Sequence, residues 1–92
     1  MSARTVLVVD SSPLTARRVQ DALRGTDFVV VIALGLNEAS SALEAGEIAV
    51  ALVALTFAGG NGYDLTRLIK ERNPEAVVFL LCGGFEVFHA RS

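Results

Sequence analysis

Four short apolar runs constrain the fold of this chain more than any other feature. They are Thr5–Val9, Phe28–Ala33, Ala49–Leu55 and Ala76–Leu81. Each falls far short of the ~20 residues that a helix needs to cross a bilayer, so we expect buried strands and no membrane span. The segments between them have helical character, and strands that alternate with helices predict a parallel sheet with right-handed crossovers.

Three helices are expected in the intervening segments, over residues 13–24, 38–45 and 63–72. Ser12 and Asn37 are candidate N-terminal caps, because their side-chain oxygens can accept a backbone N–H at the start of a helix. Pro13 suits a first turn, and Gly25 is a plausible stop for the first helix. The predicted order of elements is therefore βαβαβαβ.

Length and charge limit the classes of function. The 92 residues are enough for one domain, and the net charge of -2 includes no basic stripe that could neutralise a nucleic-acid backbone. A single cysteine excludes an internal disulfide and a metal site built from several thiolates. We therefore expect a cytoplasmic protein with no nucleic-acid partner and no membrane association.

Polar residues that could form a site follow the first and third predicted strands. Asp10, Ser11 and Ser12 come directly after the first strand, and a glycine-rich loop, residues 56–62, follows the third. In open parallel sheets functional residues collect in the loops at the carboxyl ends of the strands. These two loops are therefore the candidate site.

Two segments carry a resemblance to a known family. VLVVDSSPLTARRVQDAL and ALVALTFAGGNGYDLTRLIKERNP resemble the receiver domains of two-component response regulators. The resemblance implies an α/β, flavodoxin-like three-layer sandwich with a parallel sheet. Here the domain, residues 1–92, is shortened to about four strands in the order 2-1-3-4 and three helices. Gly62 matches the glycine that follows the phospho-accepting aspartate by eight positions, which places Ala54 at the acceptor position.

The residues that carry phosphorylation chemistry depart from the family's pattern. Receivers hold Mg²⁺ with two adjacent acids and the acceptor aspartate, and a hydroxyl and a lysine contact the phosphoryl group. Asp10 matches one acid, Ser11 stands at the second, and the hydroxyl position falls on Leu81, or on Cys82 if the register shifts by one. No lysine matches. The resemblance therefore implies a pseudo-receiver with no aspartyl phosphorylation, no enzymatic activity, no metal and no cofactor.

Simpler structural roles compete with functional ones at these positions. Asp10 can cap the first helix or accept backbone N–H groups, and Ser11 and Ser12 suit caps better than nucleophiles. The loop from Ala58 to Tyr63 resembles that of the pseudo-receivers on polarity proteins of gliding bacteria, a match that rests on about six residues.

The fourth predicted strand is expected to lie at an uncovered edge of the sheet. Receivers usually continue with a further helix, strand and helix that flank this strand. An apolar edge is an aggregation hazard, so the chain is a fragment, its tail folds back over the edge, or two copies pair there. We favour a homodimer, with interface candidates on the fourth strand and the tail: Val78, Leu80, Phe85, Val87 and Phe88.

These observations favour a protein–protein interaction or dimerisation module in signalling. The alternative is a flavodoxin-like domain that binds a small molecule or anion. Its site would be Ser11–Thr15, at the start of the first helix, where free N–H groups and the helix dipole favour a phosphate.

Overall fold

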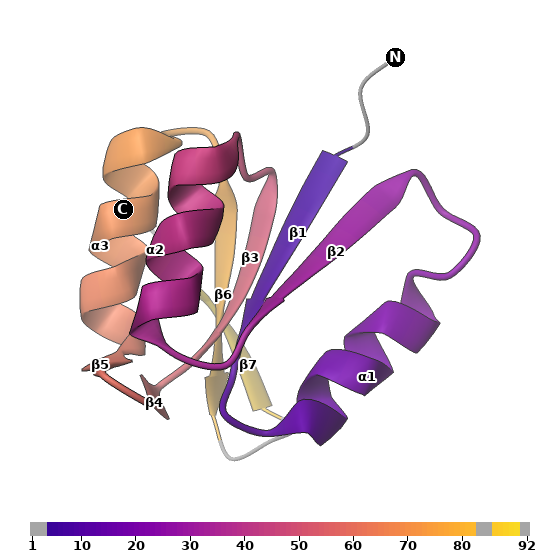
Figure 1. Ribbon diagram of the computed structural model, residues 1–92, viewed down its shortest axis with the longest axis horizontal. Coiled ribbons are helices and arrows are strands. Elements are labelled where there is room, and N and C mark those ends of the chain that lie inside the picture. Colours follow the sequence, from indigo (N-terminus) through magenta and orange to yellow (C-terminus); the bar gives the residue numbers. More distant parts are fainter. Residues whose placement is uncertain (1–3, 83–85, 91–92) are drawn as a thin grey trace.

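The structure is a computed structural model that describes residues 4–82 and 86–90. Its elements are β1 (Arg4–Val9), α1 (Pro13–Ala22), β2 (Phe28–Ala33), α2 (Leu36–Ala45), β3 (Val50–Ala54), β4 (Thr56–Phe57), β5 (Gly60–Asn61), α3 (Gly62–Arg72), β6 (Val77–Cys82) and β7 (Glu86–Ala90). All four predicted strands and all three predicted helices are present (Figure 1).

The main sheet has the order β2-β1-β3-β6-β7. Its first four strands are mutually parallel, which confirms the predicted α/β fold and the order 2-1-3-4. The fifth strand, β7, pairs antiparallel with β6. The fourth parallel strand is therefore not an uncovered edge, and the expectation that it is one was wrong. Of the three explanations considered, the structure has the tail folded back over that edge.

Helices cover both faces of the sheet and make three layers. Figure 1 shows α2 and α3 together on one face and α1 on the other. The larger core cluster lies under α2 and α3 and includes Leu7, Val53, Leu65 and Ile69. The smaller cluster lies under α1 and joins Ala16 to two valines of β1. Successive β1 residues thus enter different clusters, as the two-residue period of a strand requires.

The same alternation in β6 corrects two expected interface residues. Val78 is fully buried and Leu80 is 8% exposed, and both belong to the cluster under α2 and α3. Their side chains are therefore core residues and are not available to a partner. Phe85 lies outside the described residues. Val87 and Phe88 lie in β7 opposite Leu81 and Leu80, and nothing is described of their side chains.

The helix starts differ from the sequence predictions in detail. Ser12 is the N-cap of α1, as predicted, but its hydroxyl makes no capping hydrogen bond. The second helix begins at Leu36 with Gly35 as its N-cap, so Asn37 lies inside the helix and is not its cap. Asn61 caps α3, where its side-chain oxygen accepts the backbone N–H of Asp64 at 2.9 Å.

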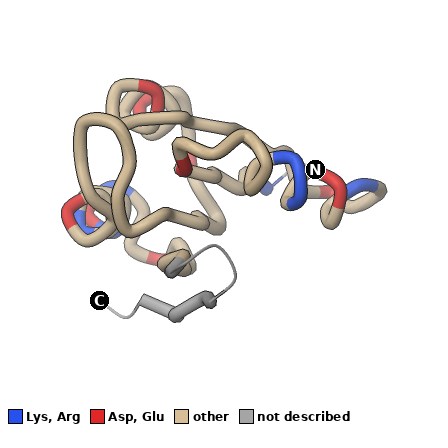
Figure 2. Tube along the Cα trace, turned by 90° about the horizontal axis from the view of Figure 1, so that it is seen from below, with Lys and Arg blue, Asp and Glu red and all other residues tan. Residues whose placement is uncertain are grey.

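Among the described residues, the charged ones lie on the helices and loops, apart from Arg4 at the start of β1 and Glu86 at the start of β7. Figure 2 shows Lys and Arg interspersed with Asp and Glu along the described part of the chain. Within that part, no helix is both long and apolar enough to cross a membrane.

Candidate functional site at the carboxyl ends of the strands

Three neighbouring strands bring the predicted site residues together. Val9 and Val53 are register partners on β1 and β3, so Asp10, which follows β1, and Ala54, which ends β3, lie at adjacent strand ends. Ala54 is in turn the register partner of Leu81 on β6. The acidic-loop, acceptor and hydroxyl positions inferred from the sequence therefore lie together at the carboxyl ends of the central strands.

Asp10 acts within its own loop. The Ser12 backbone N–H donates to Asp10 Oδ1 at 2.9 Å, and the Asp10 N–H donates to the Ala33 carbonyl of β2 at 3.2 Å. The first contact is a side-chain turn that mimics a backbone turn and fixes the entry into α1. This confirms the structural role considered for Asp10. It also places a carboxylate at the start of α1 and engages one of its first N–H groups, which counts against an anion site at Ser11–Thr15.

Ala54 ends β3 as a small, nearly buried residue. Its side chain is 8% exposed, and its strand partner across β6 is the aliphatic Leu81. The Leu55 N–H donates to the Leu81 carbonyl at 3.3 Å, which holds the two strand ends together. Neither side chain at this pair supplies a carboxylate or a hydroxyl. Cys82, the other candidate, ends β6 opposite Glu86, and its side chain lies outside the description.

The close packing of Gly62 on the end of β3 gives a steric reason for a glycine eight positions after Ala54. A Cβ at this position would lie 2.5 Å from the Ala54 carbonyl oxygen and 2.9 Å from a methyl of Leu80. Both distances are below 3.0 Å, which real Cβ contacts essentially never show. The first turn of α3 therefore packs directly on the backbone of β3, and only glycine fits. Within this loop Gly59 has a positive φ and Gly62 does not.

The glycine-rich loop is more ordered than the sequence suggested. Residues 56–57 and 60–61 pair as a short antiparallel hairpin, β4 and β5. The Ala58 carbonyl at its tip accepts the Leu36 N–H at 2.8 Å, so the loop is tied to the start of α2. The local sequence gave no signal for this contact, because its two ends are separated by more than twenty residues.

The site holds few groups suited to a metal or to catalysis. In the described part of the chain no three His, Cys, Asp or Glu side chains are placed to share a metal ion. The described residues also include no buried polar or charged side chain. Asp10 alone is a poor Mg²⁺ site, since that ion is usually held by carboxylates together with substrate phosphates.

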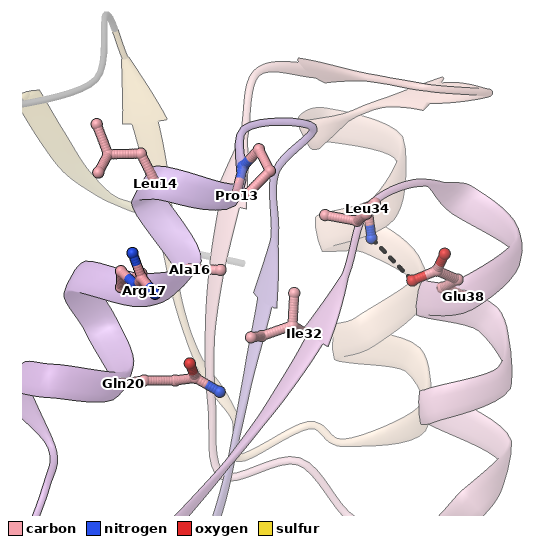
Figure 3. Close-up of a pocket in the computed structure, with 8 residues that line it drawn as sticks. All are labelled: Pro13, Leu14, Ala16, Arg17, Gln20, Ile32, Leu34 and Glu38. Atoms are coloured by element: carbon pink, nitrogen blue, oxygen red, sulfur yellow. Dashed lines mark hydrogen bonds between the residues drawn. The ribbon is translucent and has the colours of Figure 1, made fainter.

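A second feature, absent from the sequence predictions, is an open groove between α1 and the edge strand β2. Its volume is about 700 Å³, and Figure 3 shows α1 forming one wall and β2 the other. Its lining combines apolar residues with three polar side chains, Arg17, Gln20 and Glu38. The Glu38 carboxylate accepts the Leu34 backbone N–H at 3.1 Å.

Comparison with known proteins gives one consistent picture. The photosynthetic apparatus regulatory protein RegA of Cereibacter sphaeroides is 30% identical over 80 residues, which are 87% of this chain and 44% of RegA. A response regulator from Thermotoga maritima is 33% identical with a TM-score of 0.74, over 85% of this chain and 65% of that one. A Burkholderia pseudomallei response regulator with a phosphorylated aspartic acid is 24% identical with a TM-score of 0.77, over 87% and 47%. No protein-family model matches.

The chain thus has the fold of the receiver domains of response regulators, and the resemblance seen in its sequence is confirmed. It spans less than half the length of RegA. The fold supports a role as a signalling domain. The activities of RegA and the other longer proteins are properties of those proteins and are not assigned to this chain.

Proposed function

We propose that this chain is a pseudo-receiver: a signalling domain that cannot be phosphorylated and acts as a protein–protein interaction module. A cytoplasmic setting, expected from its single cysteine, is part of the proposal. The observation that carries it is Ala54, which lies at the end of β3, packed against Gly62 and beside Leu81.

The chemistry of phosphoryl transfer explains why Ala54 matters. An aspartyl phosphate forms by attack of a carboxylate oxygen, and a methyl group has no lone pair to offer. Of the described residues that match the second acid and the hydroxyl, Ser11 is exposed on the loop after β1 and Leu81 is aliphatic. With Asp10 already accepting the Ser12 N–H, metal-assisted stabilisation of a phosphate is also weak here.

Without phosphorylation, the domain acts by binding a partner through its surface. The partner is a second copy of the chain or another protein. The outer edge of β6 is covered by β7, which pairs with it. A partner that approached from there would meet β7, so Val87 and Phe88 stay candidates for such a contact, as does Phe85.

Treatment with Mg²⁺ and a small-molecule phosphodonor, followed by intact-mass measurement, tests the proposal. We expect no phosphorylated species from the natural chain, while an ordinary receiver domain treated in parallel confirms that the donor is active. Ala54→Asp is the matched variant: if it alone becomes labelled, position 54 decides the outcome. Labelling of the natural chain would contradict the proposal.

A second measurement separates the interaction module from a small-molecule binder. Thermal denaturation is recorded with Mg²⁺, beryllofluoride, FMN and nucleotides, because a ligand that binds only the folded state raises the Tm. The proposal predicts an unchanged Tm with all four. A rise with FMN or a nucleotide would favour the flavodoxin-like alternative instead.

A further inference from the structure

Among the described residues the sheet has two edge strands, β2 and β7, and each pairs with one neighbour only. The side chains are described for β2 and not for β7, so we consider β2. The strand reads FVVVIA, with no charge and no proline to oppose pairing. Exposed, uncharged edge strands of this kind are templates for another strand, and proteins usually protect them with charges, proline or a bulge.

The direction of the backbone groups in β2 follows from one hydrogen bond. The Ala33 carbonyl accepts the Asp10 N–H and therefore points toward β1. In a parallel ladder the N–H and C=O of a residue point to the same side, and successive residues point to opposite sides. The residues whose backbone groups point outward are therefore Phe28, Val30, Ile32 and Leu34.

Side chains of the domain itself already occupy both ends of this outer edge. The Phe28 N–H donates to Thr26 Oγ1 at 3.3 Å. The Leu34 N–H donates to Glu38 Oε2 at 3.1 Å, the contact drawn in Figure 3. The open N–H donors of this edge are consequently confined to the middle of the strand, at Val30 and Ile32, which are placed symmetrically about Val31.

Apolar side chains flank the same edge. Of the five large hydrophobic residues that are well exposed in the described part of the chain, three lie here: Leu14 at 56%, Val29 at 49% and Leu34 at 41%. Leu14 belongs to α1 and Leu34 follows β2, and both line the groove of about 700 Å³. An occupant of this edge would cover backbone and apolar groups together.

We propose that the occupant is a second copy of this chain, paired through β2 antiparallel to itself about a two-fold axis at Val31. The inference rests on the proposed function and names the surface that it uses. Val30 of each copy exchanges N–H and C=O bonds with Ile32 of the other, and the ladder stops at the residues whose N–H groups are already taken. A two-fold pairing needs the same groups on both sides of its axis, and this edge has them.

The side-chain pairs across the axis favour the same partner. Phe28 faces Leu34 of the second copy, Val29 faces Ala33, and Val31 faces itself. Every pair is apolar, so no like charges meet, and such cross-strand pairs stabilise a sheet. The axis is normal to the sheet, which places the α1 helices of both copies on one face, where they cover the groove.

Cysteine cross-linking tests the register directly. In a Cys82→Ser background, Val31→Cys places two thiols across the axis in a pair without hydrogen bonds, with Cα atoms about 4.5 Å apart. That separation suits a disulfide, so we expect a covalent dimer on mild oxidation. The control Val29→Cys is on the same strand and face, but its thiols lie four residues apart along the ladder. This is about 13 Å, too far for a disulfide.

If monomers cross-linked only by random collision, Val29→Cys would react faster than Val31→Cys, because Val29 is half exposed and Val31 is partly buried. The proposal is overturned if Val31→Cys stays monomeric on oxidation, or if Val29→Cys cross-links as fast. Circular dichroism on both variants confirms that the fold is retained.

Light scattering over a range of concentrations gives a second, non-covalent test. The natural chain should reach twice its mass of 9.7 kDa. Val29→Lys should weaken the dimer at least about tenfold, the equivalent of one lost apolar pair and a buried charge. The matched control Val77→Lys, on the β6 side of the sheet and 37% exposed, should leave it unchanged.

A natural chain that is monomeric at every concentration overturns the inference, as does a dimer that Val77→Lys disrupts and Val29→Lys does not. A monomer that also gains no phosphoryl group leaves the pseudo-receiver proposal standing. The two ideas therefore fail separately.

Discussion

Replacing Gly62 by alanine should destabilise the domain, although the same change usually helps a helix. The new Cβ would lie 2.5 Å from the Ala54 carbonyl oxygen, so α3 and β3 must separate by about 0.5 Å to reach even the 3.0 Å limit. The carbonyl cannot move away freely, because Ala54 is held in the ladder to Leu81. Overpacking of this kind costs about 1–3 kcal/mol, against a gain of up to about 1 kcal/mol from helix propensity. We expect a net loss of about 1–2 kcal/mol.

Urea denaturation followed by circular dichroism measures this loss. With an m-value of about 1 kcal/mol per M for a chain this small, the midpoint should fall by about 1–2 M. Two further glycines serve as controls. Gly46 has open space and extended backbone, so Gly46→Ala should be neutral or slightly stabilising. Gly25 has open space but a φ of +83°, so Gly25→Ala reports strain without a clash. A Gly62→Ala midpoint at or above that of the natural chain would refute the steric argument.

Two side chains that hold the elements in place give further predictions. Asn61→Ala removes the cap of α3 and should cost about 1 kcal/mol in urea denaturation. Asn61→Ser keeps an accepting oxygen without setting a second carboxylate beside Asp64, to which the Asn61 amide donates at 2.9 Å, and should restore most of the loss. Equal losses in both variants would contradict a capping role. Asn73→Ala leaves the part-buried Ile48 N–H without the 3.0 Å bond that it makes to Asn73 Oδ1, and should cost about 1–2 kcal/mol. A loss below about 0.5 kcal/mol there would mean that water replaces the amide.

The sequence predicted the parallel core of the fold because its apolar runs and helical segments alternate without ambiguity. It failed where a long-range contact decided the outcome. The second helix starts at Leu36 because the Leu36 N–H is held by the carbonyl of Ala58, which no local pattern reveals. The pairing of β7 with β6 is a different case, because the two strands are only three residues apart in the sequence, and a tail folded back was one of the three alternatives that the sequence left open.

The faces of β6 could not be assigned from the sequence for a related reason. The strand reads VVFLLC, with no polar residue to mark which alternate positions meet solvent. Only the packing of α2 and α3 on one face of the sheet buries Val78 and Leu80. At the site the outcome was better. The resemblance aligned Asp10, Ala54 and Leu81 with one set of loops, and the register of the strands brings these three positions together.

The central claim is that this domain acts through its surfaces without a phosphoryl switch. Native mass spectrometry of the natural chain, before and after incubation with Mg²⁺ and a phosphodonor, reads modification and assembly in one spectrum. The account predicts the same unmodified dimer in both samples, because Ala54 cannot accept a phosphoryl group and the β2 edge does not depend on one. A phosphorylated species, or a change in assembly when the donor is added, would contradict it.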